Sequence, residues 1–207
     1  MLAVAGNHLN DIGLTSPDAR VRPVLTRLLD AARALGVPLV FVPSFRRSAI
    51  DSPADLDRTA AVLRWAAVQA EARGLLLASE NVLPGEQARA LAEQVGSTAF
   101  RLVLDTFNPV AAGLSCAALV DAVGDLLADQ VHVKDGPPDV GPTPPLGAGA
   151  GRLDDTLGAL HRRRVPVRAL VLENDYRDGD RARLRTDLDW ALRRARQLTQ
   201  NPTEAGG

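Results

Sequence analysis

The sequence predicts an α/β fold of the (β/α) barrel type with six parallel strands. Short apolar runs alternate with longer amphipathic stretches along the whole chain. Strict alternation of this kind implies a parallel sheet with right-handed crossovers, in either an open doubly wound sheet or a barrel. No G-x-G-x-x-G or Walker-type glycine motif follows an early strand, which argues against the nucleotide-binding open sheets. The barrel is therefore the favoured architecture.

Length and composition fit one globular domain. With 207 residues and 46% hydrophobic content, the chain can bury one sizeable core. We therefore expect a single domain over residues 1–198 and a disordered tail over residues 199–207, with a tight pair of domains as the alternative. Aromatic residues make up only 3% of the chain, so the core must consist of Leu, Val and Ala, which suits helices packed on a parallel sheet.

Charge and cysteine content indicate which binding partners and which cellular compartment to expect. The net charge is −1, and charges of both signs are interspersed without a basic stripe, so nucleic acid is a poor candidate partner. The single cysteine, Cys116, cannot form an intramolecular disulfide and is expected to be a small buried apolar residue. The apolar opening is too short for a signal-peptide core, and no run approaches ~18 apolar residues. We therefore expect a cytoplasmic protein without a membrane partner.

Apolar runs and boundary residues place the individual elements. Gly36 is expected to end the first long helix, because glycine is common just past a helix C-terminus. Ser52, Pro53 and Asp55 are typical of a helix start, with Ser at the N-cap, Pro at the first position and an acid at the third. The predicted strands cover residues 2–5, 38–42, 75–78, 100–104, the segment around 131–133, and 167–172; the predicted helices cover about 21–35, 53–72, 85–95, 117–127, 153–164 and 180–198.

The segment from Gly136 to Gly151 is the one low-complexity stretch, because ten of its sixteen residues are Gly or Pro. Such a composition excludes regular structure, and periodic segments resume directly after it. We therefore expect a functional or mobile loop rather than a linker.

Four successive predicted strands end in a residue that can bind a metal ion. Glu80, Asp105, His132 and Glu173 lie at these ends, with spacings of 25, 27 and 41 residues. In a parallel barrel the C-terminal strand ends converge on one rim, so these side chains are expected to be neighbours in space. Three carboxylates and one imidazole form an oxygen-rich set that suits one Mn²⁺ or Mg²⁺ ion, with Co²⁺ or Zn²⁺ as alternatives.

Each of these residues also has a simpler explanation. Asp105 could act only as a helix N-cap, and His132, taken alone, could be a core histidine whose hydrogen bonds are satisfied. Glu80 and Glu173 are harder to explain in that way. Each follows a strongly apolar strand, where an unpaired carboxylate would be costly.

The stretch Asp129–Gly136 (DQVHVKDG) carries further candidates. It delivers His132, Lys134 and Asp135 to one strand end, directly before the glycine-rich loop. Lys134 is the only lysine in a chain with 23 arginines, which suggests that the ammonium group itself matters at this position.

The succession LLLASEN, LVLDTFN, VHVKD and LVLEND resembles the later strands of the xylose isomerase-like TIM-barrel superfamily. The resemblance extends from Leu2 to about Leu198, and it depends on the order and spacing of short motifs. It implies a sugar or sugar phosphate isomerase/epimerase that acts on a small carbohydrate. In that family a divalent metal is held by Glu, Asp, His and Glu at four strand ends, a pattern that maps onto the four residues named above.

The same resemblance implies a mechanism. A proton is removed from a carbon next to a carbonyl, and the metal stabilises the enediolate that develops. Glu80 and Glu173 would flank the substrate, one as base and the other as acid. The expected substrate contacts are His8, Asn81, Asn108 and Lys134. For His8, a position in a surface loop without a binding role is the alternative.

The family has eight βα units, whereas only six are predicted here. A barrel of ~250 residues allots roughly 31 residues to each unit, so six units need roughly 190. We expect that the first two units are missing, through N-terminal loss or a late start codon. The alternative is a naturally short barrel that covers its open edge, at residues 2–5, by forming a homodimer.

Three further readings of the function differ from the epimerase. A dehydratase of the inosose type would begin with the same removal of a proton next to a carbonyl, so the sequence does not separate the two. A non-catalytic, truncated sugar-binding barrel is the rival from another class. The DNA-repair branch of the family needs extra histidine ligands, and Asn108 stands where one is required, so endonuclease activity is not expected.

Overall fold

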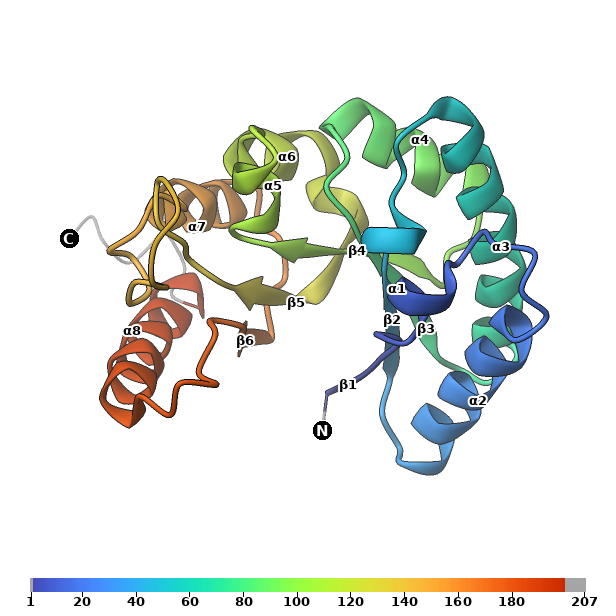
Figure 1. Cartoon of the computed structure of the whole chain (residues 1–207), viewed down its shortest axis with the longest axis horizontal. Helices are drawn as coiled ribbons and strands as arrows, with labels where there is room; N and C mark the ends of the chain where they lie inside the picture. Colours follow the sequence, from blue (N-terminus) through green and yellow to red (C-terminus); the bar gives the residue numbers. More distant parts are fainter. Residues whose placement is uncertain (1, 200–207) are drawn as a thin grey trace. The chain divides into compact units, whose positions relative to one another are not determined.

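The computed structural model describes residues 2–199 and contains two compact units, Met1–Val103 and Leu104–Gly207. Its six strands follow one another in chain order, β1-β2-β3-β4-β5-β6 (Figure 1). A sequential parallel order is the one that (β/α) barrels use, so the predicted fold class with six parallel strands is confirmed. The predicted tail lies outside the described residues from position 200 onward.

The first unit holds three complete strands and most of the fourth. Its register pairs Ala5 with Phe41, Pro43 with Glu80, and Glu80 with Val103, always in parallel. Helix α2 packs against β1 and β2, and α3 packs against β3 and α4. The elements are β1 (Ala3–Ala5), α2 (Val21–Ala34), β2 (Leu39–Pro43), α3 (Pro53–Glu71), β3 (Leu76–Glu80), α4 (Gly85–Val95) and β4 (Phe100–Asp105).

Local boundary signals act as the sequence predicts in this unit. The hydroxyl of Ser52 accepts a hydrogen bond from the backbone N–H of Asp55 at 3.2 Å, and Pro53 occupies the first helical position of α3. Gly36 follows the last turn of α2 with φ at +64°, a left-handed conformation that favours glycine. Both helix boundaries are therefore encoded by neighbouring residues.

The second unit begins inside β4, which continues beside β5. The backbone N–H of Thr106 donates to the carbonyl of His132 at 3.0 Å, and β5 pairs with β6 in parallel, with His132 opposite Val171. Helix α8 packs against β6, and α6 packs against α7. The elements are α6 (Cys116–Val123), β5 (Leu127–Val133), α7 (Leu153–Arg162), β6 (Ala169–Leu172) and α8 (Arg181–Thr199).

Short helical segments occupy stretches that carry no predicted element. These segments have only three or four residues, so no apolar periodicity could reveal them. They are α1 (Leu9–Ile12), η1 (Arg46–Ser48) and α5 (Asn108–Ala111), while η2 (Gly124–Leu126) replaces the end predicted for the helix before β5. Residues 136–151 contain no helix or strand, as their composition predicts.

The core consists of aliphatic side chains, as the low aromatic content predicts. Strand β2 is buried along its whole length, and several leucines are fully buried in each unit. The largest of these buried leucines include Leu9, Leu25, Leu63, Leu77, Leu91, Leu104 and Leu160. Within residues 2–199, no helix is long and apolar enough to cross a membrane.

Replacing the N-cap residue of α3 should destabilise the chain measurably. Ser52→Ala removes the acceptor for the Asp55 amide and should lower the free energy of unfolding by about 1 kcal/mol, whereas Ser52→Gly should cost only a few tenths. Urea unfolding followed by circular dichroism measures both changes. Equal stabilities of Ser52→Ala and the unmodified chain would contradict the capping role.

The thiol of Cys116 should be unreactive in the folded chain. It is 2% exposed, and burial, with the nearby carboxylate of Asp105 as a second cause, raises its pKa from 9.0 to about 12. The folded state therefore retains the proton more strongly than the unfolded state. This contribution to stability is present below about pH 9 and is lost as the pH rises through 12.

Iodoacetamide labelling at pH 8 tests this expectation. Labelling of Cys116 should be slow in buffer and fast in urea. Stability measured from pH 8 upward should fall less in Cys116→Ala than in the unmodified chain. Rapid labelling without denaturant would show that the thiol is accessible.

Candidate metal centre

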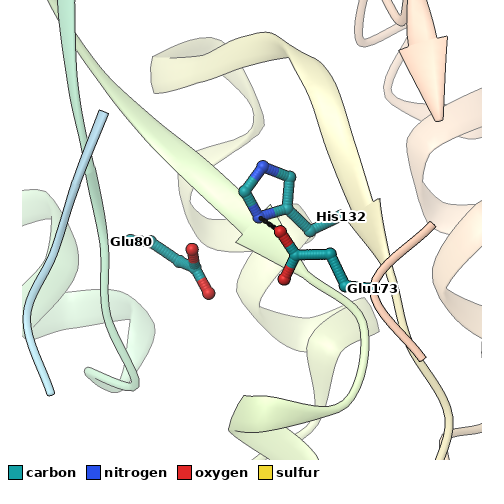
Figure 2. Close-up of side chains that lie close together, drawn as sticks. All are labelled: Glu80, His132 and Glu173. Atoms are coloured by element: carbon teal, nitrogen blue, oxygen red, sulfur yellow. Dashed lines mark ion pairs between the residues drawn. The ribbon is translucent and has the colours of Figure 1, made fainter. Parts of the chain in front are cut away.

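His132 and Glu173 meet at the C-terminal ends of neighbouring strands. The parallel register of β5 and β6 places His132 beside Val171, and the backbone N–H of Glu173 donates to the carbonyl of Val133 at 3.0 Å. Imidazole Nδ1 and carboxylate Oε1 are 3.1 Å apart, and Figure 2 shows the two groups facing each other. The imidazole is 1% exposed, whereas the Glu173 side chain is 32% exposed and accessible to solvent.

The close approach of these two groups requires either a proton on Nδ1, which a neutral imidazole can carry, or a cation between them. A carboxylate oxygen accepts hydrogen bonds but cannot donate, and an unprotonated imidazole nitrogen has the same limitation. At 3.1 Å the pair is attractive only when a proton or a cation lies between Nδ1 and Oε1. Imidazole and carboxylate are also common ligands of divalent transition metals. The donor set therefore fits a metal ion.

Asp105 is held by the turn that follows β4. Its Oδ1 accepts backbone N–H bonds from Phe107 at 2.8 Å and Asn108 at 2.5 Å, so the carboxylate caps the start of α5. The side chain is 2% exposed. In the described part of the second unit, Asp105 is not in the compact group of ligand atoms that contains His132 and Glu173. The simpler role considered for Asp105, that of a helix cap, therefore applies to its Oδ1 oxygen.

Glu80 is the last residue of β3 in the first unit. It is 4% exposed, and its carbonyl accepts a hydrogen bond from the backbone N–H of Ser44 at 2.8 Å. The strand ends two residues later than the predicted end at Ala78, so Glu80 belongs to the sheet rather than to the following loop. A carboxylate buried to this degree is costly unless it is neutralised by a partner or an ion.

Two predicted substrate contacts lie together in the second unit. The ammonium of Lys134 donates to the side-chain oxygen of Asn108 at 3.1 Å. The Lys134 backbone is fixed by Thr106, whose hydroxyl accepts from the Lys134 N–H at 2.9 Å and donates to the Lys134 carbonyl at 2.7 Å. Both side chains are half-buried. The only lysine of the chain is therefore oriented by two residues that follow β4.

The two remaining predicted contacts have local surroundings in the first unit. Asn81 accepts a hydrogen bond from the N–H of Leu83 at 3.1 Å and donates to the hydroxyl of Ser79 at 3.3 Å, so it stabilises the turn after β3. His8 is exposed and precedes α1. A role in substrate binding stays a prediction for both residues.

A buried polar network of the second unit joins Asp135, a candidate from the sequence, to two residues, Asn174 and Asp187, that were not predicted as part of a site. Asp135, Asn174 and Asp187 are linked by hydrogen bonds, and Asp187 also accepts from the hydroxyl of Tyr176 at 2.7 Å. Burial raises the pKa of the Tyr176 hydroxyl, and the hydrogen bond to Asp187 raises it further, so the hydroxyl remains a donor. The alternating glycines at 147, 149 and 151 were a sequence signal for close backbone approach.

Comparison with known proteins supports the resemblance noted in the sequence. The family model described as xylose isomerase-like TIM barrel matches residues 2–194. A 2-epi-5-epi-valiolone 7-phosphate 2-epimerase from Actinoplanes sp. (strain ATCC 31044 / CBS 674.73 / SE50/110) is 64% identical over 195 residues, which are 94% of this chain and 72% of that protein.

Solved structures agree on the fold. D-psicose 3-epimerase from Clostridium cellulolyticum H10, solved with D-tagatose, has a TM-score of 0.72 at 20% identity and is matched over 97% of this chain and 79% of its own. The IolI protein with a bound zinc atom has a TM-score of 0.69 at 21% identity, over 96% and 74% of the two chains. With a family model that spans nearly all of the sequence and a relative of high identity, the chain belongs to the xylose isomerase-like TIM barrel family.

Proposed function

We propose that the chain is an epimerase that inverts a carbon next to a carbonyl group in a phosphorylated, sugar-like ketone. The observation that carries this proposal is the 64% identity to a 2-epi-5-epi-valiolone 7-phosphate 2-epimerase across 94% of the chain. The name of that relative specifies a ketone, a phosphate and inversion at one carbon. We take this compound as the first substrate to test.

One divalent ion is the proposed cofactor, and Glu80, His132 and Glu173, each at or near the C-terminal end of a parallel strand, are its proposed ligands. In support, Nδ1 of His132 and Oε1 of Glu173 approach each other to 3.1 Å, and Glu80 is a buried carboxylate at the end of β3. Asp105 is the proposed fourth ligand, through the oxygen that does not cap α5. When bound, such an ion polarises the carbonyl and so acidifies the neighbouring C–H bond. Mn²⁺ and Mg²⁺ fit the oxygen-rich set, with Co²⁺ and Zn²⁺ as alternatives.

The two glutamates are the proposed proton carriers. Inversion requires that a proton leaves one face of the carbon and that another arrives at the opposite face. Glu173 lies beside the buried His132 but is partly exposed, so a substrate that enters from solvent can contact its carboxylate. This position suits a group that exchanges protons with the substrate. Glu80 is more deeply buried and would serve the opposite face. The ammonium of Lys134, oriented by Asn108, is placed to bind an anionic or hydroxyl oxygen of the substrate.

The proposal is tested with 2-epi-5-epi-valiolone 7-phosphate in D₂O, followed by proton NMR. We expect inversion at carbon 2 with incorporation of solvent deuterium, loss of activity after treatment with EDTA, and recovery with Mn²⁺. Glu173→Gln should lower kcat by about 10²- to 10⁴-fold, because it removes a general acid or base. Glu71→Gln, at an exposed glutamate that ends α3, is the matched control.

Different outcomes exclude different parts of the proposal. A Glu173→Gln variant as active as the unmodified chain would remove Glu173 from the mechanism. Full activity after EDTA treatment would remove the metal. Release of water from the substrate, seen as a new alkene signal, would indicate a dehydratase instead.

A further inference from the structure

We propose that Asp135, Asn174 and Asp187 form a buried polar network that positions Glu173 and Lys134 for the reaction. This inference rests on the proposed function, because it assigns these three residues as positioning residues for the same site. All three belong to the second unit and are at most 5% exposed. None of them carries a proposed chemical role in proton transfer or metal binding.

Asp135 holds the glycine-rich loop through backbone hydrogen bonds. One carboxylate oxygen accepts from the N–H groups of Gly136 at 2.9 Å and Gly151 at 2.8 Å. The other accepts from the N–H groups of Gly147 and Gly149, both at 2.9 Å. Four amide donors stabilise the buried negative charge. The carboxylate therefore fixes the return of the loop directly beside β5.

The glycines of this loop are needed for that arrangement. A Cβ atom at Gly149 would lie 2.4 Å from Oδ1 of Asp135 and 2.4 Å from the carbonyl of Gly136, and one at Gly151 would lie 2.8 Å from the same Oδ1. All three distances are shorter than van der Waals contact, so a side chain at either position would push the loop away from the carboxylate. The loop and Asp135 are thus a matched pair.

Asn174 connects this loop to helix α8. Its side-chain oxygen accepts from the backbone N–H of Asp135 at 2.9 Å, and its amide group donates to Oδ2 of Asp187 at 2.9 Å and to the carbonyl of Pro144 at 3.1 Å. Asp187 lies on α8 and accepts in addition from the backbone N–H of Leu146 at 2.8 Å. The central amide therefore uses its oxygen and both N–H groups.

The covalent neighbours of the network are the residues that matter for the reaction. Asn174 directly follows Glu173, and Asp135 directly follows Lys134. Strand β6 is only half-buried along its length, so core packing alone constrains Glu173 weakly. The hydrogen bond between the Asp135 N–H and Asn174 fixes both strand ends relative to each other. A displacement of 1 Å at a reacting group can cost on the order of 10²-fold in rate.

Asp187→Asn tests the network, with Asp189→Asn as the matched control. Asp189 lies on the same helix and is exposed. The replacement at 187 converts one accepting oxygen into an amide group that cannot accept, so either Leu146, or Asn174 together with Tyr176, loses its acceptor. We expect kcat for epimerisation to fall about 10- to 100-fold with a smaller change in KM, and Mn²⁺ affinity measured by calorimetry to fall about 10- to 100-fold. The control should change neither.

Hydrogen exchange gives a readout that does not depend on activity. Amides in residues 136–151 should exchange faster in Asp187→Asn than in the control, because the Leu146 N–H loses its acceptor or Asn174 releases the loop. A merely structural role would lower the melting temperature yet leave kcat and Mn²⁺ affinity unchanged in the folded chain. All measurements are therefore made at a temperature where circular dichroism shows the variant folded.

Tyr176→Phe is the second variant, for use if Asp187→Asn does not fold. It removes one hydrogen bond to Asp187 and keeps the carboxylate, so the same changes are expected at about threefold. The proposal would be overturned if the folded variants had the same kcat, the same Mn²⁺ affinity and the same rate of hydrogen exchange in the loop as the unmodified chain. If the unmodified chain shows no epimerisation, the proposed function fails, while Mn²⁺ affinity and exchange still decide whether the network positions Glu173.

Discussion

A buried carboxylate must be neutralised or must accept several hydrogen bonds, and this constraint organises the polar interior of the chain. Removing a carboxylate from water without compensation costs several kcal/mol. Asp105 meets the requirement with two amides of the following turn, and Asp135 meets it with four amides of the glycine-rich loop. Asp187 uses a tyrosine hydroxyl, an asparagine amide and a backbone amide. Segments without regular structure are ordered around these charges.

The residues proposed to act on the substrate meet the same requirement differently. Glu173 faces an imidazole rather than a set of amides, and about a third of its side chain reaches solvent. Glu173 is therefore open to a ligand from solvent, whereas both oxygens of Asp135 are occupied by amide donors of its loop. The neighbouring groups of each carboxylate therefore determine whether it is proposed to react with the substrate or to support the structure.

The fold was predictable because its signals are local. Ser52 and Gly36 mark helix ends through bonds to residues a few positions away, and each apolar strand is recognisable by itself. His132 and Glu173 could also be predicted to approach each other, since parallel strands align their C-terminal ends. The hydrogen bond from Asn174 to Asp187 gave no such signal. It depends on how α8 packs against β6, and Asp187 lies in no motif.

The glycine-rich loop divides into two parts with different freedom to change. Its returning part, Gly147 to Gly151, is locked against Asp135, and even a methyl group at Gly149 would collide with that carboxylate. Its outer part, residues 138–141, is exposed, and Val140 has no burial at all. Evolution can therefore alter the outer part without disturbing the residues beside the proposed metal centre. Substitutions at the tip should therefore leave the four backbone hydrogen bonds of Asp135 intact.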